Sequence, residues 1–225
     1  MRVVALIPAR NEAARVADTV RAVLAIEGVT RVLVIDDGST DATSDEARGA
    51  GAEVVRLGRN AGKGGALNTG LYRVREDADV LLLLDADLGQ TASEGARLLV
   101  PVLAGDADMT IGQLPKPPGS GGFGLVKGLA RWGIRRLGGG FDATAPISGQ
   151  RALSRAAWQA ATPFASGYGA EVALTVRALR AHMRVVEVPV EMAHAATGKD
   201  LAGFAHRGRQ FLQIALALIK LAAQR

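Results

Sequence analysis

Four short runs of almost continuous apolar residues alternate with longer helical segments in the first half of this 225-residue chain. The apolar runs span residues 2–7, 31–35, 53–57 and 79–84. The helical segments span residues 13–26, 42–50 and 63–75. A strand that is apolar on both faces must be covered on both faces, which is the arrangement of parallel strands joined by crossover helices. The pattern predicts an α/β fold with a mostly parallel central sheet flanked by helices.

The second half of the chain is less regular. It carries helical patterns at 92–103, 125–137, 168–181 and from 201 to the end. Strand-like segments at 108–112, 146–153 and 184–192 lie between these helices. Residues 113–124 are rich in proline and glycine and predict a loop. Because no internal repeat or linker interrupts the pattern, we expect a single domain over residues 1–225.

Composition excludes several classes of site and partner. The chain has no cysteine, so disulfides, thiolate zinc sites and cysteine nucleophiles are excluded. A net charge of +5 favours an anionic membrane surface or a phosphorylated substrate, and no nucleic acid is expected because no run of five basic residues occurs. The chain shows neither a signal peptide nor an apolar stretch of about 18 residues. We expect a cytoplasmic protein, with peripheral contact at the inner face of a membrane left open.

Polar clusters follow each of the first four predicted strands. They are "PARNE" (8–12), "DDGSTD" (36–41), "RNAGKGGAL" (59–67) and "DADLGQ" (85–90). Ligands of open parallel sheets bind beyond the carboxyl ends of the strands, which meet at one edge. The sequence therefore predicts a ligand-binding cleft lined by these four clusters.

The pair Asp85 and Asp87 is a candidate metal site, because a turn after Leu84 would let both carboxylates reach one cation. Mg²⁺ and Mn²⁺ prefer such carboxylates together with phosphate oxygens. In the alternative interpretation, Asp87 caps the helix at 92–103 or is simply solvated. Lys63 opens a predicted helix and can approach a phosphate, although the Walker A pattern is not met.

The acidic cluster after the second strand also has two interpretations. Asp36 follows directly on a buried strand and has no expected capping role, so it could accept hydrogen bonds from a nucleobase or ribose. Alternatively, the cluster is a turn in which Thr40 or Asp41 caps the helix at 42–50.

The order of these motifs resembles the family 2 glycosyltransferases with the GT-A fold. The matching segments are "IPARNE" (7–12), "VIDDGSTDAT" (34–43), "NAGKGGALNTG" (60–70) and "LLLLDADLGQ" (81–90). Dolichyl-phosphate mannose synthases and glucosyl-3-phosphoglycerate synthases are the most similar branches, and "SGQRALSR" (148–155) and "GYGAEVAL" (167–174) extend the likeness. The resemblance implies a nucleotide-sugar-binding half at 1–112 and an acceptor-side half at 113–225, with the loop 113–124 closing over the donor.

The resemblance also implies roles for individual residues. The nucleotide site would comprise Pro8, Ala9, Asn11, Glu12, Asp36, Asp37, Ser39, Gly62, Lys63, Gly64 and Asp85. Asp85, Asp87 and His194 would hold Mg²⁺ or Mn²⁺, with a surface loop position as the alternative for His194. The chain departs from lipid-acceptor relatives at Gly89, where they often have glutamine, and it lacks a Gln-x-x-Arg-Trp motif.

The expected reaction is transfer of a hexose from a UDP- or GDP-sugar to an anionic acceptor, either a polyprenyl phosphate or a small phosphorylated metabolite. The predicted catalytic residues are Asp87, Lys63, Arg151 and Glu171, with Asp142 as a second candidate base. Glu171 could instead be solvated or anchor Arg151. The phosphate-binding arginines would be Arg131, Arg135, Arg136 and Arg151. A sugar nucleotidyltransferase and a non-catalytic nucleotide-sugar binder remain alternatives.

The last helical segment carries an apolar stripe with helical spacing. Its members are Phe211, Ile214, Ala215, Leu218 and Leu221. The stripe would pack on the sheet or on a second subunit of a homodimer. Alternatively, it would lie in a membrane interface and bring the protein to a lipid-linked acceptor.

Overall fold

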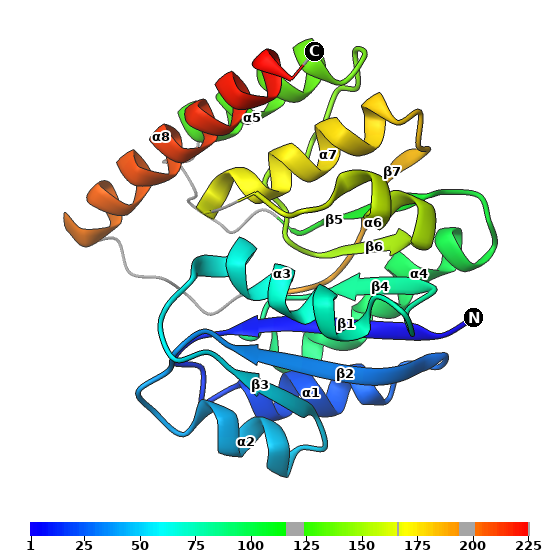
Figure 1. Cartoon of the computed structure of the whole chain (residues 1–225), viewed down its shortest axis with the longest axis vertical. Helices are drawn as coiled ribbons and strands as arrows, with labels where there is room; N and C mark the ends of the chain where they lie inside the picture. The colour runs from blue at the N-terminus through cyan, green and yellow to red at the C-terminus, as the bar shows by residue number, and fades with distance from the viewer. Residues whose placement is uncertain (116–123, 166, 194–200, 225) are drawn as a thin grey trace.

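A seven-stranded sheet forms the centre of the computed structural model, which describes residues 1–115, 124–165, 167–193 and 201–224 (Figure 1). The strands are β1 (Val3–Ala9), β2 (Val29–Asp36), β3 (Glu53–Arg56), β4 (Val80–Leu83), β5 (Met109–Gln113), β6 (Arg151–Ser154) and β7 (Val185–Pro189). Their order in the sheet is β3-β2-β1-β4-β6-β5-β7. Every pairing is parallel except those of β6, which runs antiparallel to both β4 and β5. The predicted mostly parallel α/β fold is confirmed.

Helices cover both faces of this sheet. They are α1 (Val16–Leu24), α2 (Thr43–Gly49), α3 (Gly62–Val74), α4 (Gly95–Leu103), α5 (Gly124–Leu137), α6 (Arg155–Ala161), α7 (Ala170–Arg180) and α8 (Leu201–Ala223). Two short 3-10 helices, η1 (Gly89–Glu94) and η2 (Gly167–Gly169), precede α4 and α7. All the predicted helices are present, whereas α6 was not predicted, because seven residues give too short a periodic pattern to recognise.

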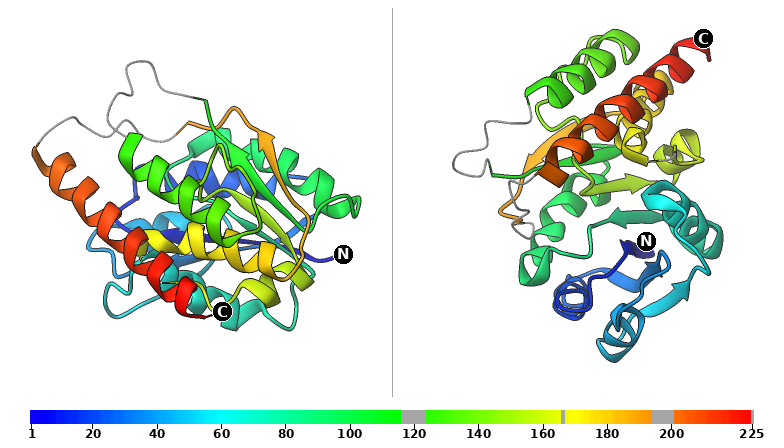
Figure 2. Two further views of the ribbon diagram at one scale, coloured as in Figure 1. Left: turned by 90° about the horizontal axis from the view of Figure 1, so that it is seen from above. Right: turned by 90° about the vertical axis from the view of Figure 1, so that its left-hand side faces the viewer.

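The continuous apolar runs arise because each central strand feeds two cores. On β1, Val3, Ala5 and Ile7 pack with α1, α2 and α4 on one face of the sheet. Val4 and Leu6 point the other way and pack with α3, α6 and α7. Successive side chains of a strand alternate between its faces, so a strand buried on both sides carries no polar position. Figure 2 shows these helix layers on the two sides of the sheet.

The apolar stripe of α8 packs on other helices and not on the sheet. Ile214, Leu218 and Leu221 are buried in a third cluster with residues of α5 and α7. Phe211 belongs to the predicted stripe but is 39% exposed. The expectation of packing on the sheet is therefore wrong, because α5 and α7 provide the apolar surface that α8 covers. Among the described residues, no helix is long and apolar enough to cross a membrane.

Glu187 on β7 holds the segment that leads into β6. Its carboxylate accepts hydrogen bonds from the backbone N–H groups of Thr144 and Ala145, the latter at 2.7 Å, and from Gln113 Nε2 at 2.9 Å. Burial raises the pKa of Glu187, but the hydrogen bond donated by the Thr144 hydroxyl, together with those above, outweighs burial and holds the pKa below its ordinary value of 4.5. The ionised carboxylate thus fixes the path of the chain before Ser148.

We expect Glu187→Gln to lower the free energy of unfolding by about 2 kcal/mol at pH 7, because charge-assisted hydrogen bonds are replaced by neutral ones. Since the folded-state pKa is depressed, the contribution is complete above about pH 4.5 and is lost as the pH falls through the lower folded value. Urea unfolding at pH 7 and pH 3 measures the size of this destabilisation and its loss at low pH. The exposed Glu27→Gln is the control. An equal loss at both pH values would contradict the role of the charge.

Candidate active site

The ends of β1, β2, β3 and β4 meet at one edge of the sheet, as predicted. The parallel register pairs Ala9 with Asp36, Asp36 with Arg56, and Leu6 with Leu83. The polar clusters that follow these strands consequently contact one another. Three of these contacts build the site.

The first contact joins the loop after β1 to the loop after β2. The Asn11 backbone N–H donates to Ser39 Oγ at 3.0 Å, and Asn11 Oδ1 accepts from the Thr40 N–H at 2.9 Å. Asn11 adopts a left-handed φ of 56°, a conformation that asparagine tolerates better than most residues. At the end of β1 Pro8 is half-buried, while Ala9 is buried and its carbonyl oxygen accepts from the Asp37 N–H at 2.8 Å.

Asp36 supports this edge from inside. The side chain is fully buried and accepts hydrogen bonds from the Ser39 N–H, at 2.8 Å, and from Ser44 Oγ in α2. Burial raises the pKa of Asp36, but the serine hydrogen bonds and the nearby Arg56 guanidinium together lower it below its ordinary value. Asp36 makes no capping hydrogen bond to α2, as expected, but its carboxylate turns inward and ties the turn to the Ser44 hydroxyl.

Asp37 makes the second contact, which fixes the start of α3. Its two carboxylate oxygens accept from the backbone N–H groups of Ala61, at 2.6 Å, and Gly62, at 2.9 Å. Gly62 has a φ of +76°, which glycine adopts without strain, and Gly64 is buried in the helix. The predicted phosphate-binding cluster thus becomes a rigid helix start that carries Lys63.

The predicted turn after Leu84 is present. Thr19 Oγ of α1 donates to the Ala86 carbonyl and accepts from the Gly89 N–H, both at 2.8 Å. This bridge pins the turn, and Asp85 and Asp87 both lie half-buried in it. Neither η1 nor α4 receives a side-chain capping hydrogen bond, so the alternative role of Asp87 as a helix cap is wrong.

Negative charge accumulates around this turn. Burial raises the pKa of Glu12, and repulsion from Asp87, Asp41 and Asp85 raises it further, while Arg15 opposes the shift. The negative field of three carboxylates that favours protonation of a fourth also favours the binding of a cation. Three of the acidic residues predicted for the site, Glu12, Asp85 and Asp87, therefore share one electrostatic environment.

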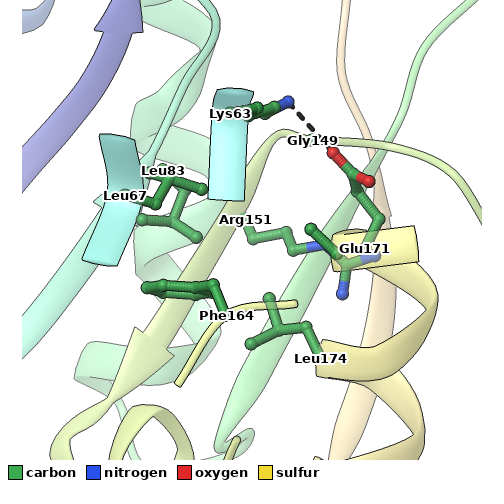
Figure 3. Close-up of a pocket in the computed structure, with 9 residues that line it drawn as sticks. Lys63, Leu67, Leu83, Gly149, Arg151, Phe164, Glu171 and Leu174 are labelled. Carbon is green, nitrogen blue, oxygen red and sulfur yellow. Dashed lines mark ion pairs between the residues drawn. The ribbon is translucent and has the colours of Figure 1, made fainter. Parts of the chain in front are cut away.

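Lys63 makes the third contact and links this acidic turn to α7. Its ammonium lies 2.6 Å from Asp85 Oδ1 and 3.1 Å from Glu171 Oε1, and Figure 3 shows the pairing with Glu171. Burial by itself would lower the pKa of Lys63, but the two carboxylates outweigh burial and raise it, so the ammonium stays charged. Gln150 Nε2 donates to the second oxygen of Asp85 at 2.9 Å.

Arg151 lies beside this ion pair, at the start of β6. Its side chain is only 1% exposed, and its guanidinium donates to the Ser148 carbonyl at 2.9 Å and to Thr175 Oγ at 2.8 Å. Nη2 has no hydrogen-bond partner among the described residues. Burial lowers the pKa of Arg151 to about 10, which still leaves it charged at neutral pH.

A small pocket opens between α3 and α7, beside the paired strands β4 and β6 (Figure 3). It is lined by Lys63, Leu67, Leu83, Gly149, Arg151, Phe164, Ala170, Glu171 and Leu174. The apolar side chains form one wall, and the charged groups of Lys63, Arg151 and Glu171 converge at the other. A few charged groups beside an apolar wall are the lining of small-molecule sites, but the empty volume of about 230 Å³ is below the roughly 300–1,000 Å³ of most of them.

Residues 4–155 match the family model described as glycosyl transferase family 2. The chain belongs to this family. Two curated relatives are glycosyltransferase AglJ of Haloferax volcanii and the undecaprenyl-phosphate mannosyltransferase of Micrococcus luteus. They are 32% identical over 87% of this chain and 30% identical over 89% of it, respectively. The chain spans 64% of the first relative's length and 87% of the second's. A third relative, the uncharacterised protein MJ1222 of Methanocaldococcus jannaschii, is 34% identical, and the match covers 66% of this chain and 63% of that protein.

Solved structures confirm the GT-A fold of this family 2 chain. A glucosyl-3-phosphoglycerate synthase of Mycobacterium tuberculosis, in complex with Mn²⁺, UDP and phosphoglyceric acid, superimposes with a TM-score of 0.82. The two chains are 24% identical, and the match covers 98% of this chain and 78% of the other. A complex of the same enzyme with UDP-glucose gives a TM-score of 0.80.

Two residues that lie beside the acidic turn are not assigned from the sequence. Gly149 leaves so little room that an added Cβ would lie 2.3 Å from Lys63 Nζ, and Gln150 binds Asp85. The antiparallel pairing of Leu83 with Arg151 brings them beside the acidic turn. The segment "SGQR" is part of the resemblance, but its contact with Asp85 depends on the antiparallel direction of β6. No local sequence pattern encodes that direction.

Several predicted residues are not brought to the pocket. Arg131 forms an ion pair with Asp142, at 2.6 Å between Nε and Oδ1, on the exposed surface. Arg135 and Arg136 end α5 near Leu137, whose carbonyl accepts from Arg180 at the end of α7 opposite to Glu171. These arginines therefore do not line the site, whereas Arg151 does. His194 lies outside the described residues.

We expect Lys63→Met to lower the free energy of unfolding by about 2 kcal/mol, because Asp85 and Glu171 lose their shared cation. Glu171→Gln should lower the free energy of unfolding by about 1 kcal/mol less in the Lys63→Met variant than in the wild type, since the Lys63–Glu171 ion pair is already absent there. Urea unfolding of the four proteins measures this coupling. Lys220→Met, on the exposed surface of α8, is the control. Strictly additive effects would show that the pair does not contribute.

Proposed function

We propose that this chain transfers a hexose from a UDP- or GDP-sugar to a phosphorylated acceptor, with Mg²⁺ or Mn²⁺ as cofactor. The observation that carries the proposal is the placement of Asp85 and Asp87 in a pinned turn at the edge of the sheet, with Lys63 2.6 Å from Asp85. Membership of glycosyl transferase family 2 supports the reaction type. The relative of known fold binds UDP and Mn²⁺, which supports the donor and the cofactor.

The residues present fit a divalent cation. Asp85 and Asp87 offer hard oxygen ligands, and the raised pKa of Glu12 reflects the negative field that a cation would relieve. Among the described residues no group of three metal-binding side chains is assembled. We propose that His194 and diphosphate oxygens of the donor complete the shell. The cation would neutralise charge on the departing nucleoside diphosphate.

Lys63 has a second role in the proposed reaction. In the structure its ammonium is shared between Asp85 and Glu171, so its position depends on two carboxylates from opposite sides of the pocket. A cation at Asp85 competes with Lys63 for that carboxylate, and the donor diphosphate is a stronger anionic partner for the ammonium. We propose that Lys63 then turns toward the diphosphate and stabilises its developing charge, the kind of electrostatic term that dominates many enzymatic rate enhancements.

The anionic acceptor is supported by Arg151. Its buried guanidinium lines the pocket, stays charged at neutral pH, and has one Nη2 group without a hydrogen-bond partner among the described residues. Undecaprenyl phosphate, for which one relative is named, and phosphoglyceric acid, which is bound in a structure of the same fold, both carry a phosphate group. We propose that an acceptor of this kind presents an anionic group to Arg151.

Glu171 is the favoured base if the acceptor nucleophile is a hydroxyl. It lines the pocket, whereas the alternative, Asp142, is exposed and hydrogen-bonded to Arg131, which holds its pKa below the ordinary range. Movement of Lys63 toward the diphosphate would release Glu171 to accept a proton. If the nucleophile is a phosphate oxygen, it is already ionised and needs no base.

The decisive experiment is a turnover panel of UDP- and GDP-hexoses with Mn²⁺ or Mg²⁺, with small phosphorylated metabolites and polyprenyl phosphate as acceptors. Transfer with release of UDP or GDP supports the proposal. Release of pyrophosphate would instead indicate a nucleotidyltransferase, and binding without turnover a non-catalytic nucleotide-sugar binder.

We expect Asp85→Asn and Asp87→Asn each to weaken Mn²⁺-dependent binding of UDP or GDP at least about tenfold, since each removes a charged metal ligand. Both side chains are half-buried at the rim, so the fold should survive. Isothermal titration calorimetry with and without Mn²⁺ measures the effect. Asp106→Asn, on the surface before β5, is the matched control. Unchanged affinity in both site variants would exclude the metal role.

His194→Ala tests the remaining proposed ligand. A histidine ligand must be unprotonated, so wild-type affinity for Mn²⁺ should decline below about pH 6.5. The variant should bind more weakly at pH 7.5 and lose this part of the pH dependence. A variant with the wild-type affinity and pH profile would mean that His194 takes no part in the site.

A further inference from the structure

An unusual surface lies across α5 and α8, on the side of these helices away from the sheet. The left-hand view of Figure 2 shows the two helices side by side at the surface. They pack closely where Gly133 of α5 meets Leu218 of α8, since an added Cβ at Gly133 would lie 2.3 Å from Leu218. The inward stripe of α8 is therefore covered by α5 and α7, and the opposite stripe faces solvent.

That opposite stripe is apolar as well. Leu212, Leu216 and Ile219 recur at helical spacing on α8 and are 63%, 57% and 65% exposed. On α5 Leu125 and Trp132, two turns apart, are 83% and 61% exposed. These five side chains, here called the outer apolar face, lie opposite the buried residues of their own helices. Exposed apolar side chains gathered on neighbouring elements mark an interaction surface more often than scattered ones do.

The charged residues of α5 and α8 themselves all have one sign. Neither 124–137 nor 201–223 contains an aspartate or a glutamate. The exposed charged side chains described on these helices are Arg131, Arg135, Arg136 and Lys220. Arg131 is paired with Asp142, while no ion pair with a carboxylate of the described residues is formed by Arg135, Arg136 or Lys220. The surface thus combines protruding apolar groups with a net positive charge, which Asp142 offsets in part beside Arg131 and Arg135.

We propose that the outer apolar face docks on an anionic lipid bilayer. Apolar side chains that enter the boundary between headgroups and acyl chains, flanked by arginine and lysine that meet anionic headgroups, are the features that hold a helix in a membrane interface. Trp132 adds a ring of the kind that concentrates at this boundary. The surface differs from the stripe predicted from the sequence, whose main members are buried inside the helix layer.

A second copy of the chain fits this surface less well. A two-fold contact would place the basic side chains of α5 and α8 opposite the same side chains of the partner, and like charges across an interface oppose association. The bilayer supplies the complementary charge. α8 also contacts η2 at the edge of the pocket, where an added Cβ at Gly169 would lie 2.4 Å from Ala217, so docking would bring the pocket near the membrane.

Vesicle co-sedimentation of the full chain tests the proposal without depending on the transferase activity. We expect sedimentation with vesicles containing about 30% phosphatidylglycerol, weak sedimentation with pure phosphatidylcholine, and partial retention at about 0.5 M salt, where simple charge attraction is screened. Leu212→Ser/Leu216→Ser/Ile219→Ser should reduce binding at least tenfold, and Arg135→Gln/Arg136→Gln severalfold. Tyr72→Ser/Val100→Ser, which removes exposed apolar groups elsewhere, should bind like the wild type.

Tryptophan fluorescence gives an independent readout of the bound surface. The chain has two tryptophans, and Trp158 is only 4% exposed, so a blue shift on adding anionic vesicles should come from Trp132 and vanish in Trp132→Phe. Three results would overturn the proposal. The first is a failure to sediment with anionic vesicles at low salt, and the second is vesicle binding that survives the triple substitution. The third is a lipid-independent dimer that light scattering detects in the wild type and not in the triple variant.

Discussion

The shared ion pair of Lys63 with Asp85 and Glu171 is the interaction on which the site depends. Lys63 lies in the first turn of α3, Asp85 follows β4, and Glu171 lies in the first turn of α7. The ammonium therefore joins the first half of the chain to the second across the pocket. Without that cation, Asp85 would lack a countercharge in the negative field that it shares with Glu12 and Asp87, and Glu171 would remain as an unpaired carboxylate across the pocket.

The surrounding residues serve mainly to hold this cation in place. Asp37 binds the backbone at the start of α3 and sets the direction in which Lys63 leaves the helix. Gln150 occupies the oxygen of Asp85 that Lys63 does not, and the absence of a side chain at Gly149 leaves space for the ammonium. In the proposed function, the ion pair between Lys63 and Asp85 is exchanged for two others. A divalent cation replaces the Lys63 ammonium at Asp85, and the donor diphosphate replaces Asp85 as the partner of Lys63.

The two halves of the molecule present different chemistry. The edge formed by β1 to β4 is rigid and acidic, held by Thr19, Asp36 and Asp37 through buried hydrogen bonds. The helices α5 and α8, which cover α7, carry no acidic residue and expose apolar side chains. A nucleotide-sugar site on the first and a lipid-facing surface on the second would suit an enzyme that combines a water-soluble donor with an acceptor located at a membrane.

The sequence by itself determined the parallel part of the fold and the position of the site. Continuous apolar runs required strands covered on both faces, and the polar clusters that follow them had to share one edge because parallel strands end together. Only the tertiary structure decided which residues face the pocket. Asp36 turned inward because Ser39 and Ser44 satisfy its carboxylate, Arg135 and Arg136 lie at the far end of α7, and Gly149 and Gln150 reached Asp85 through the antiparallel β6. The direction of a strand in a sheet is set by packing between distant segments, and local residue patterns contain no record of it.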